Sequence, residues 1–148
     1  NKEMFKKYGL KPPATWSEFL DVCAKLKKQG IIPLSIGGRD AWTILHPFMY
    51  MADRAGGTKL YNEAKAGKAR FDHPDFVKAF TLLETLSKKG YLPPDVLNLT
   101  YGDATQLMVR DKAAMMSQGN WLYNILTNES TSDFDKWDFF PFPVIEGG

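Results

Sequence analysis

The sequence has 148 residues, of which 44% are hydrophobic and 24% charged, a composition that fits one globular domain with its own core. The formal net charge is +2 with acidic and basic residues interspersed, so the basic patch of a nucleic-acid-binding protein is missing. One cysteine excludes an internal disulfide, and no stretch is long and apolar enough to span a membrane. The aromatic share, 14%, is high, and aromatic residues line binding surfaces as well as fill cores.

The first part of the chain predicts two helices. A helix over 1–8 ends before Gly9, and a second begins after Thr15, whose hydroxyl can form a capping box with Glu18. The second helix carries one apolar stripe at helical spacing, formed by Trp16, Phe19, Leu20, Cys23 and Leu26. Because Cys23 lies within this stripe, we interpret it as a small buried hydrophobe and not as a nucleophile.

A strand followed by glycines and a helix comes next. The strand covers 31–36, Gly37 and Gly38 follow it, and a helix is predicted over 41–55. Paired glycines before a helix can cradle a phosphate, but this spacing matches neither a dinucleotide-binding fingerprint nor a P-loop. We therefore expect a polar loop that presents Arg39, Asp40 and Trp42 to one edge of a sheet.

The middle of the chain is predicted to form helices separated by glycines. Gly56 and Gly57 interrupt the chain, and a short helix is predicted over 59–66. The next helix has Asp72 or His73 at its cap and ends at Gly90. A further helix can be capped by the segment 100–103.

A second corner of the same kind follows. The segment 113–117 is apolar, uncharged and short, as expected of a strand buried on both faces. Gly119 and Asn120 tolerate unusual backbone angles and can cap a helix that starts near Trp121. Ligands of α/β sheets bind at the carboxyl edge, so we interpret Trp121 as one wall of a small-molecule site, with a sugar as the favoured ligand. The alternative is an ordinary core tryptophan.

The end of the chain is predicted to be irregular. The polar segment 124–135 is interpreted as a surface loop, and 137–144 as an edge strand or a crossing segment because Pro141 and Pro143 interrupt it. Helices that alternate with short strands indicate an α/β domain with at least three strands.

Catalytic and metal-binding patterns are missing from the sequence. His46 and His73 are too far apart for a local metal pair, and neither a zinc motif nor a nucleophile elbow occurs. We interpret His46 as a packed or capping group. The cluster Asp133, Asp135 and Asp138 departs from the calcium-loop pattern. A glycosidase needs two facing carboxylates, and the sequence selects no such pair.

Several runs resemble a known family. The run over 5–20, FKKYGLKPPATWSEFL, closely resembles the opening of the carboxy-terminal lobe in extracellular solute-binding proteins of family 1, the sugar receptors of bacterial ABC importers. The runs GIIPLSIGG over 30–38, GKARF over 67–71, KAAMMSQGNW over 112–121 and FPFP over 140–143 support the resemblance.

The resemblance implies an α/β fold, the helix-rich lobe of a type II periplasmic-binding-protein-like fold with a small central sheet. Residues 1–148 then form a single domain, most of the carboxy-terminal lobe, and the amino-terminal lobe lies outside this chain, which we expect to be a piece of a longer protein. Family members close two lobes on a sugar. The aromatic residue that stacks on the pyranose ring corresponds to Trp121, and Asp40, Trp42 and Asn120 correspond to further contacts, with Gly119 and Arg39 beside them.

The same resemblance implies the partners and the location. They are a sugar ligand and ABC permease subunits, with no nucleic acid, no cofactor and no metal, and the protein is expected to be an extracytoplasmic monomer, periplasmic or anchored as a lipoprotein. Two alternatives stay open: a carbohydrate-active hydrolase domain, and a purely structural interaction domain.

Overall fold

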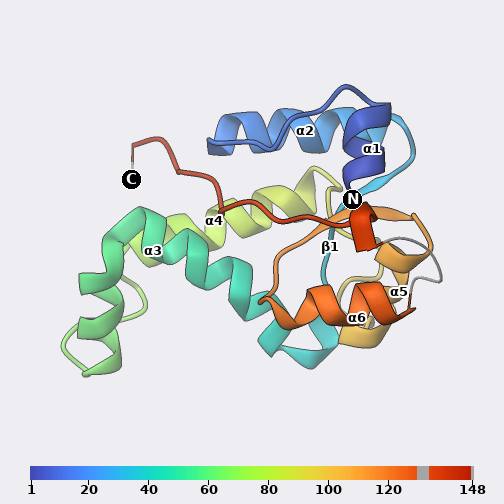
Figure 1. The fold of residues 1–148 in the computed structure, drawn as a ribbon. Coiled ribbons are helices and arrows are strands. Elements are labelled where there is room, and N and C mark those ends of the chain that lie inside the picture. Colours follow the sequence, from blue (N-terminus) through green and yellow to red (C-terminus); the bar gives the residue numbers. More distant parts are fainter. Residues whose placement is uncertain (130–133, 148) are drawn as a thin grey trace.

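The computed structural model describes residues 1–129 and 134–147. Its elements, in chain order, are α1 (Lys2–Lys7), α2 (Trp16–Lys28), β1 (Ile32–Ser35), η1 (Gly38–Asp40), α3 (Trp42–Lys65), α4 (Pro74–Lys88), α5 (Tyr101–Val109), β2 (Ala113–Met116), α6 (Trp121–Glu129) and η2 (Phe134–Lys136). Helices surround a small sheet, as Figure 1 shows. None of the described helices combines the length and the apolar character that crossing a membrane would need.

The sheet consists of β1 and β2, which pair in parallel with Ile32 opposite Ala113 and Ser35 opposite Met116. The expectation of at least three strands is therefore wrong for the described residues. The segment 137–144 makes only an isolated bridge between Thr15 and Val144 and otherwise crosses the molecule between α2 and α6 (Figure 1). Its prolines lack the backbone N–H that a ladder needs, so the crossing-segment alternative is confirmed.

Local capping signals determine where several helices begin. The Thr15 hydroxyl accepts from the Glu18 amide at 3.3 Å and the Glu18 carboxylate accepts from the Thr15 amide at 3.2 Å, so the predicted capping box is confirmed. Thr100 and Asp103 form a second capping box at the start of α5. His73 caps α4, where its ring nitrogen Nδ1 accepts from the Asp75 amide at 3.3 Å.

Two helices differ in extent from the sequence-based expectation. α3 runs to Lys65, but Gly57 adopts φ 71° within it and kinks it, so the predicted interruption is confirmed. α6 continues to Glu129, and the expected surface loop over 124–129 is wrong. Ile125 is half-buried and Leu126 fully buried on the inner face of α6, which extends the apolar side of that helix. The remainder of that loop, 130–133, lies outside the described residues.

Two apolar cores hold the elements in place. The larger joins α2, α3 and α4 to the sheet, and the smaller lies under α6 and consists of Met108, Ala113, Leu122, Leu126 and Trp137. Cys23 is fully buried in the larger core, and this burial raises the pKa of its thiol to about 12. Its interpretation as a small hydrophobe is confirmed.

Candidate functional site

The two strand–glycine–helix corners lie side by side. β1 and β2 are parallel, so the loops 37–41 and 117–120 both leave the carboxyl edge of the sheet. The Gln118 side chain joins them, because its amide nitrogen donates to the backbone carbonyl of Thr43 at 3.4 Å. The Thr43 hydroxyl in turn donates to the carbonyl of Gly37 within the buried interior. One hydrogen-bonded unit therefore holds both corners.

Four rings meet at this edge, and we name them the aromatic platform: Trp42, His46, Tyr101 and Trp121. The ring centroids of His46 lie 5.4 Å from Trp42 and 5.6 Å from Trp121, and Trp42 lies 4.9 Å from Tyr101. These separations are typical of interacting aromatic pairs. The expectation that Trp42 and Trp121 share one edge is confirmed.

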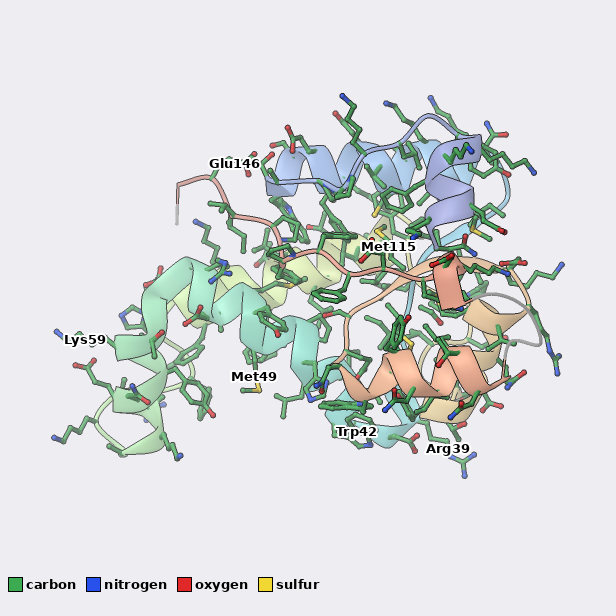
Figure 2. The ribbon with its side chains drawn as sticks, viewed as in Figure 1. Arg39, Trp42, Met49, Lys59, Met115 and Glu146 are labelled. Atoms are coloured by element: carbon green, nitrogen blue, oxygen red, sulfur yellow. The ribbon has the colours of Figure 1, made fainter. Side chains whose placement is uncertain are left out.

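Both indole rings of the platform remain open to solvent. Trp42 is 41% exposed and Trp121 is 44% exposed, whereas Trp16 and Trp137 are 6% and 5% exposed in the cores. Figure 2 shows Trp42 beside the first turn of α6, far from Lys59 at the other end of α3. The alternative of Trp121 as an ordinary core residue is wrong, because nearly half of this large apolar side chain is left uncovered.

Gly37 and Gly38 serve close packing. A Cβ on Gly37 would collide with the backbone of Thr100, and one on Gly38 would come within 2.9 Å of the Val96 carbonyl oxygen. The paired glycines thus let the loop approach the segment that precedes α5. That role accounts for both glycines without a phosphate.

Asp40 binds the backbone at the start of α5, and Arg39 is exposed to solvent. The Asp40 carboxylate accepts a hydrogen bond from the Tyr101 amide, the first residue of α5, where a negative charge suits the helix dipole. Arg39 is exposed and points outward in Figure 2. The hydrogen bonds of Thr100 hold the pKa of Asp103 below its usual value, with a smaller contribution from the Arg39 charge. Of the three residues expected to face the edge together, only Trp42 belongs to the platform.

Gly119 positions the second indole. Its φ is not positive, so the tolerance of glycine for unusual backbone angles is not used at Gly119. A Cβ on Gly119 would collide with the ring of Trp121, which folds back over this residue. Asn120 is exposed next to the ring, and its carbonyl oxygen accepts from the Tyr123 amide at 3.1 Å.

The sequence did not single out His46 and Gln118 as site residues. His46 Nδ1 lies 2.8 Å from Gln118 Oε1, and its ring contacts both indoles. A local signal existed for His46, which follows Trp42 by four residues and thus shares its helical face. Gln118 had none, because its partners Thr43 and His46 are 75 and 72 residues away along the chain.

A groove of about 850 Å³ adjoins the platform. Its walls are the loop 117–120, the inner side of α6 and the crossing segment 138–143, with Tyr50 and Arg54 of α3 at one side. Tyr50 stacks on Phe142 with ring centroids 5.2 Å apart. The loop 117–120 therefore borders both the groove and the platform.

The described residues contain no group of three or more His, Cys, Asp or Glu side chains arranged to hold a metal ion. Of the aspartate cluster, Asp133 lies outside the described residues, and Asp135 and Asp138 are exposed. The chemistry available at the platform is apolar ring faces together with a small number of amide and imidazole groups.

Comparisons with known proteins agree on one family. The sequence model described as bacterial extracellular solute-binding protein matches residues 1–148. An uncharacterised ABC transporter extracellular-binding protein of Pyrococcus horikoshii is 32% identical over 124 residues, which cover 82% of this chain and 27% of that protein.

Solved structures agree as well. One comes from work on xylan utilisation by the thermophilic bacterium Caldanaerobius polysaccharolyticus. It has a TM-score of 0.94 at 34% identity, and the match covers 100% of this chain and 38% of the chain in that structure. A chitin oligosaccharide binding protein has a TM-score of 0.90 at 29% identity, over 99% of this chain and 37% of its own.

These neighbours are type II periplasmic binding proteins, so the expected fold class is confirmed. The chain spans well under half the length of each of these relatives. A relative from Streptococcus mutans, 26% identical over 130 residues that cover 82% of this chain and 30% of that protein, is named as a multiple sugar-binding protein. Because the family model matches the chain over its whole length and the fold agrees with that of the solved structures, the chain belongs to the bacterial extracellular solute-binding protein family.

Proposed function

We propose that this chain forms the carboxy-terminal half of a sugar-binding cleft, and that the complete protein delivers a sugar or oligosaccharide to an ABC permease. The observation that carries the proposal is the pair of indoles, Trp42 and Trp121, left more than two-fifths exposed although both belong to one packed aromatic cluster. Leaving two large apolar rings in water forgoes favourable burial, which a bound ligand recovers.

A pyranose suits this surface. Its C–H face is apolar and covers an indole, while its hydroxyl groups need polar partners at the rim. His46, Gln118 and Asn120 supply such groups beside the rings. A hydroxyl buried without a partner costs about 1–3 kcal/mol, so these side chains contribute to the choice of sugar.

The chain spans 38% and 37% of the two neighbour structures, which supports a complete protein with a second lobe that closes over the platform. Membership of an extracellular family supports an extracytoplasmic location, periplasmic or lipid-anchored. The site holds the sugar without breaking a bond. We assign residues 40, 42 and 119–121 to this site. Asp40 positions Tyr101 through a hydrogen bond to its amide, and Gly119 leaves room for the ring of Trp121.

Calorimetric titration of the full-length protein tests the proposal. The ligands are xylo-oligosaccharides and chitin oligosaccharides, chosen because neighbour structures come from xylan utilisation and chitin oligosaccharide binding. We expect saturable binding to one of them, which Trp42→Ala and Trp121→Ala weaken at least tenfold. The control, Tyr61→Ala, changes a partly exposed aromatic residue in the distal part of α3 and leaves affinity unchanged.

Chromatography of the same mixtures separates a receptor from an enzyme. Recovery of intact oligosaccharide after prolonged incubation supports a receptor. Release of shorter sugars would contradict it in favour of the hydrolase alternative, and no response to any sugar would favour the structural one.

A further inference from the structure

We propose that His46 selects the sugar: Gln118 fixes its tautomer, so that Nε2 accepts a hydrogen bond from one hydroxyl of a pyranose lying on Trp42 and Trp121. The inference rests on the proposed function and extends it by naming the group that discriminates. His46 is the specificity-determining residue, and Gln118 acts through it as a positioning residue.

The orientation of the Gln118 amide follows from its two partners. Its Nε2 lies 3.4 Å from the Thr43 carbonyl oxygen, an acceptor that only a donor can satisfy. The Gln118 oxygen Oε1 therefore faces His46, with 2.8 Å between Oε1 and Nδ1. Because an amide oxygen only accepts, Nδ1 of His46 carries the proton, and in the neutral ring Nε2 carries a lone pair.

The remaining ring nitrogen is available for a ligand. Nε2 of His46 has no hydrogen-bond partner among the described residues, and it is not a buried unpaired atom. The imidazole contacts both indoles, with ring centroids 5.4 Å from Trp42 and 5.6 Å from Trp121. A sugar that covers these rings brings its hydroxyls to the edge of the imidazole.

A fixed acceptor makes a chemical distinction among sugars. A hydroxyl donates to Nε2, whereas a methoxy group at the same carbon does not, and a deoxy carbon leaves the lone pair unmatched. The site thus requires a free hydroxyl at the one ring position that meets His46. Polar side chains that reject an unmatched partner discriminate more strongly than apolar walls do.

Nuclear magnetic resonance tests the tautomer without any ligand. The chain has two histidines, and the structure gives them opposite roles, because His73 Nδ1 accepts from the Asp75 amide while His46 Nδ1 donates. At about pH 8, where an ordinary imidazole is neutral, long-range proton–nitrogen spectra of the full-length protein should show protonated Nδ1 in His46 and protonated Nε2 in His73. Gln118→Leu should abolish the difference, and the exposed control Gln29→Leu should preserve it. Protonated Nε2 in wild-type His46 would overturn the proposal.

A double-mutant comparison tests recognition. Xylotriose and chitotriose are titrated against the full-length protein, together with their single deoxy and single O-methyl derivatives. For the parent sugar that binds, one ring position should lose about tenfold in affinity when modified, and His46→Phe, which keeps a ring beside the indoles, should erase that loss.

The outcomes separate the two proposals. Binding that needs Trp42 and Trp121 but shows no modification effect erased by His46→Phe overturns the role of His46 and leaves the sugar-binding function in place. Failure of the wild-type protein to bind either parent sugar overturns both.

Discussion

Replacing Gly119 by alanine tests how the second indole is positioned. The new Cβ would collide with the ring of Trp121, which lies over Gly119. The φ of Gly119 is not in the positive range, so alanine adds no backbone strain. The substitution therefore acts through the ring alone, and the ring must swing away from its place in the platform.

The expected losses of stability and affinity follow from the contacts that the Trp121 ring loses. Separation from His46, now at a centroid distance of 5.6 Å, removes an aromatic pair worth about 0.5–1.5 kcal/mol of stability. The effect on binding should be larger. A displaced indole behaves as a truncated anchor, and truncation of a binding tryptophan costs about 2 kcal/mol or more. That figure corresponds to a loss of roughly thirtyfold in affinity.

The assay combines urea unfolding with calorimetric titration of the oligosaccharide that the wild type binds. Gly102→Ala is the matched control, since its Cβ would meet only the Thr100 hydroxyl oxygen at 3.7 Å. Within α5 this control should gain about 1 kcal/mol of stability and keep full affinity. Wild-type affinity in Gly119→Ala despite a changed tryptophan fluorescence would refute the role assigned to Trp121. Unchanged fluorescence would refute the claim that Gly119 positions the ring.

Three further outcomes are expected. Cys23, whose thiol pKa is raised to about 12 by burial, should not react with a disulfide reagent at about pH 8 until denaturant is added, and reaction in the native state would contradict its burial. Ala41 adopts φ 43°, so Ala41→Gly should leave the stability unchanged or raise it by up to about 1 kcal/mol. The control Ala24→Gly, within α2, should lower the stability by about 1 kcal/mol. Equal losses of the two variants in urea unfolding would refute backbone strain at Ala41. The pKa of Asp103 is lowered, so its stabilising effect is present above about pH 4 and is lost as the pH falls through the lower native pKa. Asp103→Asn should therefore cost stability at neutral pH and little at about pH 2, and a pH-independent cost would exclude ionisation as its cause.

Features that depend on neighbouring residues could be predicted from the sequence. The capping boxes at Thr15 and Thr100, the kink at Gly57 and the two strand–glycine–helix corners each rest on chemistry within a few positions. The meeting of Trp42 and Trp121 also followed, because parallel strands bring their carboxyl ends to one edge.

Features that depend on distant partners could not be predicted. Asp40 was expected to present its carboxylate to the ligand. In the structure this carboxylate accepts a hydrogen bond from the amide of Tyr101, 61 residues later in the chain. The pairing of His46 with Gln118 spans 72 residues and has no periodicity to reveal it. The expectation of a third strand was wrong for a related reason. The extended aromatic segment 137–144 is compatible with an edge strand or a crossing segment, and only the tertiary contacts distinguish the two.

The most direct measurement of the central claim follows the four indole N–H signals of the full-length protein during titration with the oligosaccharide. Trp16 and Trp137 are buried in the two cores and serve as internal controls. The signals of Trp42 and Trp121 should shift together and saturate with the calorimetric affinity, while those of Trp16 and Trp137 stay in place. Saturable binding that leaves the Trp42 and Trp121 signals unmoved would contradict the claim that these rings hold the sugar.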